Sequence, residues 1–336
     1  MSMLHVPGRQ TAARRIAVAV TALALAAGLA ACGSTARPDT AKADTATPGA
    51  ATEAGFPRRV THDKGDTELA TKPQRIVALD NSLVEAVVLL QRPLVGGIAS
   101  YRNQKTFPDY LGEAVRNTKD IGPLDNPNLE LIASLKPDLI VSATVRHDAL
   151  YDKLSKIAPT VFVKTTGPIW KDNITLLGKA LGEEQRATRA LADYQARATR
   201  IGTAVNAKAG NPTVSVVRFL DGPTRLMAHA SFIGIILRDA GLKRPASQDK
   251  DTFAEEISEE RIELADADRI FVTTYAGGND RKAKFQANPL WQRLKAVQAR
   301  QVHEVPDELW MTSVSVQGAH FVLDDLARVF AVDPAK

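Results

Sequence analysis

The sequence predicts an α/β fold of two similar lobes, each built on a central, mainly parallel sheet, joined by one long interdomain helix. Three observations lead to this prediction. Short apolar segments alternate with helical ones, the segment 183–209 carries one unbroken helical stripe, and a motif recurs at an offset of 130 residues. Alternating strands and helices are typical of parallel sheets with helical crossovers. The chain length of 336 residues also suits two domains.

Residues 1–31 have the composition of a secretory signal peptide. A polar, basic stretch up to Arg15 precedes an apolar run of small residues that is too short to cross a bilayer comfortably. The run ends in Leu-Ala-Ala-Cys-Gly, which resembles a bacterial lipobox. Cys32 is the only cysteine in the chain, so an intrachain disulfide cannot form. We expect lipidation of Cys32, which would anchor the protein to a membrane; a small buried thiol is the alternative.

Residues 32–57 are predicted to be a flexible linker after the lipidated cysteine. They are rich in Ala, Thr, Pro, Gly and Asp and show no apolar periodicity. The net charge of +5 falls to +2 without the three arginines of the signal peptide. The remaining chain therefore has no basic excess that would indicate a nucleic-acid partner. A hydrophobic content of 44% and a charged content of 24% exclude a disordered or collagenous chain.

Residues 58–168 are predicted to form the N-terminal lobe. The apolar run 75–80 ends in a turn signal, and the helical segment 129–135 ends at Lys-Pro-Asp, which leads into the next strand. We expect strands at 75–80, 94–98, 139–142 and 159–163, and helices at 83–91, 129–135 and 151–157.

The interdomain segment is predicted to span residues 169–210. Six apolar residues recur in it at spacings of 4, 3, 4, 3 and 4 residues, which is one face of a helix. At about 1.5 Å per residue this helix is a rod of roughly 40 Å, long enough to link two lobes. Trp170 precedes the rod, and we expect it to pack at the hinge. The stripe consists of Ala187, Leu191, Tyr194, Ala198, Ile201 and Val205.

Residues 211–336 are predicted to form the C-terminal lobe. We expect strands at 214–220, 269–274 and 302–305, and helices at 232–240, 290–294 and 315–330. The repeat relates the lobes, because the segment 128–140 matches 258–270 at Glu130/Glu260, Ile132/Ile262, Asp138/Asp268 and Ile140/Ile270. A stiff rod between two such lobes creates a cleft, and open α/β sheets bind ligands beyond the carboxyl ends of their strands.

Residues 58–332 resemble the substrate-binding lipoproteins of ABC importers for ferric siderophores and cobalamin, the periplasmic-binding class with one long interdomain helix. The resemblance rests on Pro-Gln-Arg-Ile-Val-Ala-Leu-Asp at 73–80, on the 128–141 motif, on the rod, on Ser-Val-Val-Arg-Phe at 215–219 and on the segment 309–326. It implies that the loaded protein docks across two permease subunits through one acidic residue on each lobe. Glu130 and Glu260 stand at the matching positions; solvated glutamates in a first helical turn are the alternative.

Candidate ligand contacts follow the ends of the predicted strands. Arginines can fork onto metal-bound anionic oxygens, and aromatic faces add contact area. Arg218 stands inside an apolar strand, so it needs an anionic partner, either the ligand or an internal carboxylate such as Asp221. Trp310 matches an aromatic residue of the family's pocket, with core packing as its alternative. The full set is Asn81, Tyr101, Arg102 and Arg146 in the first lobe and Arg218, Tyr275 and Trp310 in the second.

Together with the resemblance, these residues predict a monomeric extracytoplasmic receptor on the outer face of the cell membrane, which captures a ferric siderophore for an ABC importer. Arginines favour an anionic iron chelate over cobalamin; haem remains an alternative, with Tyr101 or Tyr275 as its axial ligand. The six histidines show no helical ligand spacing, so we expect neither a dedicated metal-ion site nor a cofactor. No phosphate loop or nucleophile elbow is present in the sequence, so we do not expect an enzyme.

Overall fold

The computed structural model describes residues 55–99 and 106–336. The predicted signal peptide, Cys32, most of the linker, Tyr101 and Arg102 lie outside the described residues. In the part of the chain that is described, no helix has the length and apolar character that crossing a membrane requires.

The sheet of the N-terminal lobe is parallel throughout, in the strand order β5-β4-β3-β6-β7. Its strands are β3 (Ile76–Ala78), β4 (Leu94–Gly97), β5 (Lys119–Asp120), β6 (Leu139–Ala143) and β7 (Thr160–Val163). The helices between them are α1 (Asn81–Leu89), η1 (Asp109–Val115), α2 (Leu129–Ser134), α3 (Thr144–His147), η2 (Asp148–Leu150) and α4 (Tyr151–Ser155). A separate hairpin, β1 (Arg58–His62) and β2 (Gly65–Leu69), precedes this sheet and was not predicted.

The sheet of the C-terminal lobe has the order β10-β9-β8-β11-β12, and β9 runs antiparallel to both of its neighbours. Its strands are β8 (Val214–Phe219), β9 (Thr224–Met227), β10 (Ala254–Ile257), β11 (Arg269–Thr274) and β12 (Val302–Glu304). The helices are α7 (Phe232–Asp239), η3 (Ile262–Ala265), α8 (Asn279–Ala287), α9 (Pro289–Gln292), α10 (Lys295–Gln298), η4 (Glu308–Thr312) and α11 (Val316–Phe330). The two-lobe α/β fold with mainly parallel sheets is confirmed, and the sheet of the second lobe contains one antiparallel strand, β9.

One carboxylate in each lobe shows that the sequence repeat is also a structural repeat. Asp138 precedes β6 and accepts a hydrogen bond of 2.8 Å from the backbone N–H of Arg75, just before β3. Asp268 precedes β11 and accepts one of 2.8 Å from the backbone N–H of Thr213, just before β8. The matched residues therefore fasten the same pair of adjacent strands in both sheets.

Each sheet separates the buried apolar residues into one cluster on its inner face and another on its outer face. Alternate residues of a strand point to opposite faces. Ile76 and Val214 belong to a large cluster shared by both lobes, α6 and α11, whereas Val77 and Val217 belong to separate clusters on the outer faces of their sheets. The lobes thus share one continuous apolar core on the side that faces the long helix.

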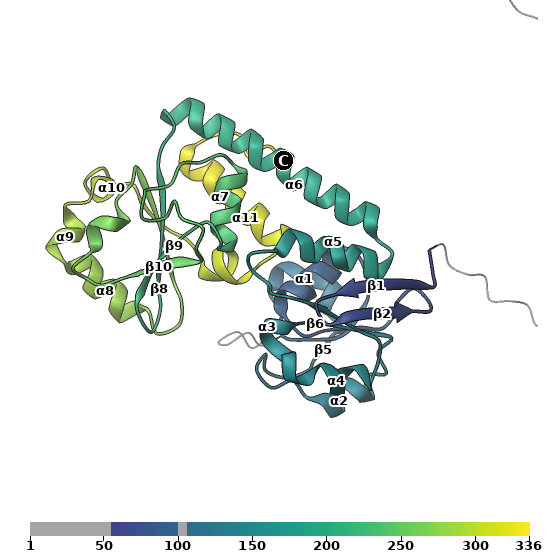
Figure 1. The fold of residues 1–336 in the computed structure, drawn as a ribbon. Coiled ribbons are helices and arrows are strands. Elements are labelled where there is room, and N and C mark those ends of the chain that lie inside the picture. Colours follow the sequence, from purple (N-terminus) through teal and green to yellow (C-terminus); the bar gives the residue numbers. More distant parts are fainter. Residues whose placement is uncertain (1–54, 100–105) are drawn as a thin grey trace, which may run out of the picture. The chain divides into compact units, whose positions relative to one another are not determined.

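The long helix is α6 (Glu184–Ala209), and it runs along both lobes on one side of the described residues (Figure 1). It follows α5 (Trp170–Leu181), which ends at Gly182 in the left-handed conformation with φ of 67°. Five residues of the predicted stripe are buried, and Leu191 is half-buried against the core. The predicted rod is therefore confirmed to within one residue at its start.

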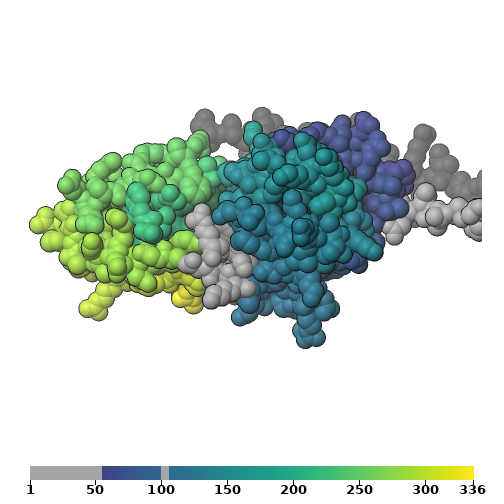
Figure 2. Space-filling view, turned by 90° about the horizontal axis from the view of Figure 1, so that it is seen from below, coloured from purple at the N-terminus to yellow at the C-terminus, as the bar shows by residue number. Residues whose placement is uncertain are grey.

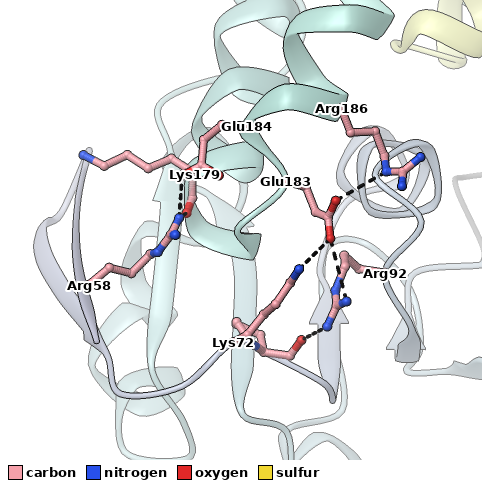
Figure 3. A network of polar contacts seen from close by, with 8 residues as sticks. Arg58, Lys72, Arg92, Lys179, Glu183, Glu184 and Arg186 are labelled. Atoms are coloured by element: carbon pink, nitrogen blue, oxygen red, sulfur yellow. Dashed lines mark hydrogen bonds and ion pairs between the residues drawn. The ribbon is translucent and has the colours of Figure 1, made fainter. Parts of the chain in front are cut away.

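Ion pairs fasten the beginning of α6 to the N-terminal lobe (Figure 3). Glu183 accepts a hydrogen bond of 2.8 Å from Lys72 and lies 3.8 Å from Arg92. Arg58 bonds Glu184 at 2.6 Å and also donates to the backbone carbonyl of Lys179. Most of these side chains are at least partly shielded from solvent, so the network is a stronger anchor than exposed pairs would be.

The middle of α6 packs on an aromatic cluster that joins α5, α6 and α7. Trp170 is 2% exposed, and its ring contacts Tyr194 and Phe232 edge-on at 5.3 and 5.6 Å. The Tyr194 hydroxyl donates to Asp239 at 2.7 Å. Trp170 thus packs where the two lobes meet the long helix, as expected for a hinge residue.

Candidate functional site

A pocket of about 310 Å³ is lined by residues of both lobes. The lobes lie side by side when the molecule is seen from the side away from α6 (Figure 2). The volume of the pocket is at the lower end of the range of volumes found for small-molecule binding sites. The N-terminal lobe contributes Val145 and Arg146, and the loop before α5 contributes Thr165, Thr166, Gly167 and Pro168. The C-terminal lobe contributes Arg218, Met227, Ser231, Phe232, Phe253, Met311 and Val314.

Arg218 reaches this pocket from the carboxyl-terminal half of β8. It follows Val214 and Val216 on the face of the sheet that points to the shared core. Its Nε and Nη2 donate to the two carboxylate oxygens of Asp307 at 2.8 and 2.7 Å. Tyr275 lies beneath the guanidinium, with its ring centre 5.0 Å away.

Arg218 therefore has an internal carboxylate partner and also lines the pocket. Asp307 supplies the ion pair, rather than the suggested Asp221. A bidentate pair holds the guanidinium in one plane and leaves its remaining N–H groups directed elsewhere. In the described chain no residue accepts a hydrogen bond from Nη1 of Arg218, so this group is available to a ligand.

Arg146 occupies the comparable place in the N-terminal lobe. It lies in α3, and its Nε donates to Asp80 at 3.1 Å. Asp80 is 1% exposed and also caps α1 by accepting from the backbone N–H of Ser82 at 2.9 Å. Each lobe thus presents one arginine to the pocket, and each arginine is oriented by a buried aspartate.

His147 fixes the turn that carries Arg146. Its Nε2 lies 2.6 Å from the carbonyl oxygen of Leu124, and its Nδ1 lies 2.8 Å from the hydroxyl of Ser142. A carbonyl only accepts, so Nε2 is the protonated nitrogen and Nδ1 accepts from the hydroxyl. Burial lowers the pKa of His147, which keeps the ring neutral at this position.

The tip of the β1–β2 hairpin supports the same turn from outside. Thr144 donates its hydroxyl proton to Asp63 at 2.5 Å, and Lys64 donates to Asp148 at 2.7 Å. The backbone N–H of Asp63 bonds the carbonyl of Phe162 at 3.0 Å, which attaches the tip to β7. The hairpin that the sequence did not predict therefore helps to position a pocket residue.

Three other predicted ligand residues have different roles in the structure. Trp310 is 0% exposed; its Nε1 donates to Asp325 at 2.8 Å and its ring stacks on Phe271, so it is packed in the core, as its alternative stated. Asn81 donates to the carbonyl of Thr312 at 2.6 Å and so ties the two lobes together. Tyr275 is not among the described residues that line the pocket, and its ring lies next to the Arg218 guanidinium.

Glu85 forms a polar junction between the lobes that the sequence analysis missed. It lies in α1 with 1% exposure and accepts hydrogen bonds from Tyr110 at 2.8 Å, from Ser313 at 2.7 Å and from Ser315. Burial raises the pKa of Glu85 to about 7, although the three hydroxyls act to lower it. The available signal was a glutamate inside the apolar run Ser-Leu-Val-Glu-Ala-Val-Val-Leu.

We expect Glu85 to make stability fall as pH rises. Its carboxyl loses the proton near 4.5 in the unfolded chain and near 7 in the folded one, so the folded state binds more protons between these values. The free energy of unfolding should therefore drop by about 3 kcal/mol across this range. Between pH 5 and pH 8 the free energy of unfolding measured in urea should fall by about this much more in the wild type than in Glu85→Gln. The comparison removes the contribution of the histidines whose pKa values are lowered by burial, which acts in the opposite direction in both proteins. Equal pH dependence in both proteins would contradict it.

Glu130 and Glu260 are both exposed on the surface of their lobes. Glu130 lies in the first turn of α2, and Glu260 lies in the turn that precedes η3. Neither forms an ion pair with any residue in the ranges 55–99 and 106–336. Over the same ranges no cluster of His, Cys, Asp and Glu has the arrangement of a metal site.

A second hollow, of about 510 Å³, lies between α6, α11 and the C-terminal residues. Several of its charged groups are already bonded to each other, because Arg197 pairs with Asp324 at 2.5 Å and contacts His320 at 3.0 Å. These contacts attach α11 to α6.

The chain is similar to known binding proteins over most of its length. The family of periplasmic binding proteins matches residues 76–309. The "Probable siderophore-binding lipoprotein YfiY" of Bacillus subtilis is 37% identical over 81% of this chain and 87% of its own length. The achromobactin-binding periplasmic protein of Dickeya dadantii is 30% identical over 77% of this chain and 87% of its own. The structure of Staphylococcus aureus SirA with staphyloferrin B has a TM-score of 0.75 and 32% identity, and covers 82% of this chain and 99% of SirA.

Proposed function

Because this chain belongs to the periplasmic binding protein family, we propose that it captures a ferric siderophore between its lobes and delivers it to an ABC importer. One observation carries the proposal: the pocket brings together Arg146 and Arg218 from opposite lobes, each oriented by a buried aspartate. The names of the relatives support the ligand class, since they refer to a siderophore, to achromobactin and to staphyloferrin B.

The arginines would bind the oxygens that surround the iron. A guanidinium stays protonated and can donate two parallel hydrogen bonds to anionic oxygens. The aspartates keep the guanidinium groups in place before the ligand arrives, which reduces the ordering cost of binding. Binding in this way needs no covalent step, and we propose that the protein is a receptor and not an enzyme.

The ligand class can be tested by tryptophan fluorescence of the protein without residues 1–32. Trp170 contacts Phe232, which lines the pocket, so binding should change its emission. We expect saturable quenching by at least one iron-loaded siderophore and none by its iron-free form. If haem alone, or cobalamin alone, quenched the fluorescence, that compound would be the ligand instead of a siderophore. If none of the siderophores, haem and cobalamin did so, the proposal would be refuted.

Replacing Arg218 should weaken binding severely. We expect Arg218→Gln to raise the Kd by about a hundredfold, because the ligand loses a charged donor and meets the carboxylate of Asp307 instead. The control is Arg225→Gln on the neighbouring strand, whose arginine pairs with Glu256 and does not line the pocket. Titrations of both variants, with circular dichroism to check folding, measure the difference. If Arg218→Gln and Arg225→Gln bound the ligand with equal affinity, Arg218 would not be a ligand-binding residue.

The other parts of the transport cycle are proposals that rest on the family. We propose that lipidation of Cys32 holds the protein on the outer face of the cell membrane as a monomer, and that residues 32–57 act as its tether. Glu130 and Glu260, exposed at matching positions of the two lobes, would meet basic residues of the permease. Mass spectrometry of the membrane-extracted protein tests the lipid, because acyl chains on Cys32 would add their mass to the N-terminal peptide.

A further inference from the structure

Two large apolar side chains are conspicuously exposed among the described residues. Val145 is 57% exposed and Phe253 is 48% exposed, and over the described ranges they are the large hydrophobic residues left in solvent. A single exposed apolar residue needs no explanation. These two, however, come from opposite lobes and line the same pocket.

The lining between them continues the apolar surface. Phe232, Met227 and Met311 belong to the same pocket wall, and Phe232 and Met227 are buried. Methionine side chains adapt to irregular apolar shapes. A ligand that enters the pocket therefore meets apolar surface at the rim and further inside.

The charged groups of the described lining carry little net charge. Arg146 and Arg218 each pair with a buried aspartate, Asp80 and Asp307, so two positive charges face two negative ones. A binding site for a small polyanion needs an excess of positive charge to attract and neutralise it. The described lining offers directional donors instead, within a mainly apolar wall.

We propose that Val145 and Phe253 form an apolar clamp that selects ferric chelates with hydrocarbon or aryl arms and few net charges over small polyanionic chelates. The arms would cover Val145 and Phe253 on the two sides of the pocket, while one or two iron-bound oxygens face the arginines. This inference rests on the proposed function and defines its substrate class. The two residues are then specificity determinants of the site.

The test compares three probes on wild type, Val145→Ser and Phe253→Ser. The probes are a ferric hydroxamate with hydrocarbon arms, a ferric catecholate with aryl rings, and ferric citrate as the small polyanion. We expect the wild type to bind the hydroxamate or the catecholate at least tenfold more tightly than ferric citrate. Each substitution should reduce that preference about fivefold or more, by weakening the armed chelate alone.

Folding is not at risk in these variants, because both side chains are exposed. Thr252→Ala is the matched control, since Thr252 is exposed beside Phe253 and does not line the pocket. Tighter binding of ferric citrate, or variants that leave the preference unchanged, would overturn the clamp while the receptor function stands. Failure of all three probes to bind would count against both.

Discussion

Replacing Gly202 with alanine will destabilise the protein by about 3 kcal/mol or more, although alanine favours helices. Gly202 lies in α6 where the helix meets the end of α7. A Cβ at this position would stand 1.6 Å from the carbonyl oxygen of Ala240 and 2.5 Å from its carbonyl carbon. Backbone atoms cannot rotate aside as a side chain does, so α6 and α7 would have to separate.

Helix propensity alone would make Gly202→Ala stabilising, so the control must be another substitution to alanine in the same helix. Alanine is better than glycine in a helix by about 1 kcal/mol, which is too little to offset a backbone clash of this size. Thr203→Ala, at the next residue of α6 on its exposed side, should leave stability unchanged or raise it slightly. Urea denaturation of both variants measures the difference. A Gly202→Ala protein as stable as the wild type would show that α6 does not pack this closely on the C-terminal lobe.

The long helix and the repeat could be predicted because each follows from a pattern in the sequence itself. The stripe from Ala187 to Val205 requires only helical periodicity, and the 130-residue offset places β6 and β11 at equivalent positions. The strands β9 and β10 could not be predicted in the same way. The segment Ala254–Ile257 has only one buried residue, so its alternation carries almost no apolar signal. The β1–β2 hairpin was missed because several of its strand residues are charged and exposed.

The site was only partly predictable, because its side chains depend on contacts between distant segments. The sequence indicated that Arg218 needs an anionic partner, but Asp307 lies 89 residues away and is brought to it by the sheet order β8-β11-β12. Trp310 was predicted at the ligand because it follows a strand and matches an aromatic residue of the family's pocket, whereas its ring nitrogen donates to Asp325 inside the lobe. Position after a strand predicts the correct edge of a sheet but not the direction of a side chain.

Loss of Glu130 and Glu260 together should abolish iron uptake while leaving ligand binding intact. Both carboxylates are exposed on the lobes, away from the lining of the pocket, so Glu130→Ala/Glu260→Ala should fold normally and bind its ligand with unchanged Kd. Charge pairs across a protein interface speed association and fix the register of the partners. Two separated contacts act together, because the second forms at high effective concentration once the first is made. Removing both carboxylates should therefore lower the rate of iron uptake far more than removing either one.

The measurement is uptake of the radiolabelled iron chelate by cells that carry the variant as their only receptor for it. Each single variant should retain part of the uptake rate, and the double variant should approach the rate of cells without the receptor. Glu113→Ala/Glu304→Ala is the matched control, since these glutamates are exposed one on each lobe and pair with Arg116 and Lys282 instead. If the double variant at Glu130 and Glu260 transported iron at the control rate, these two residues would be ordinary surface glutamates, and the permease would have to recognise another part of the lobes.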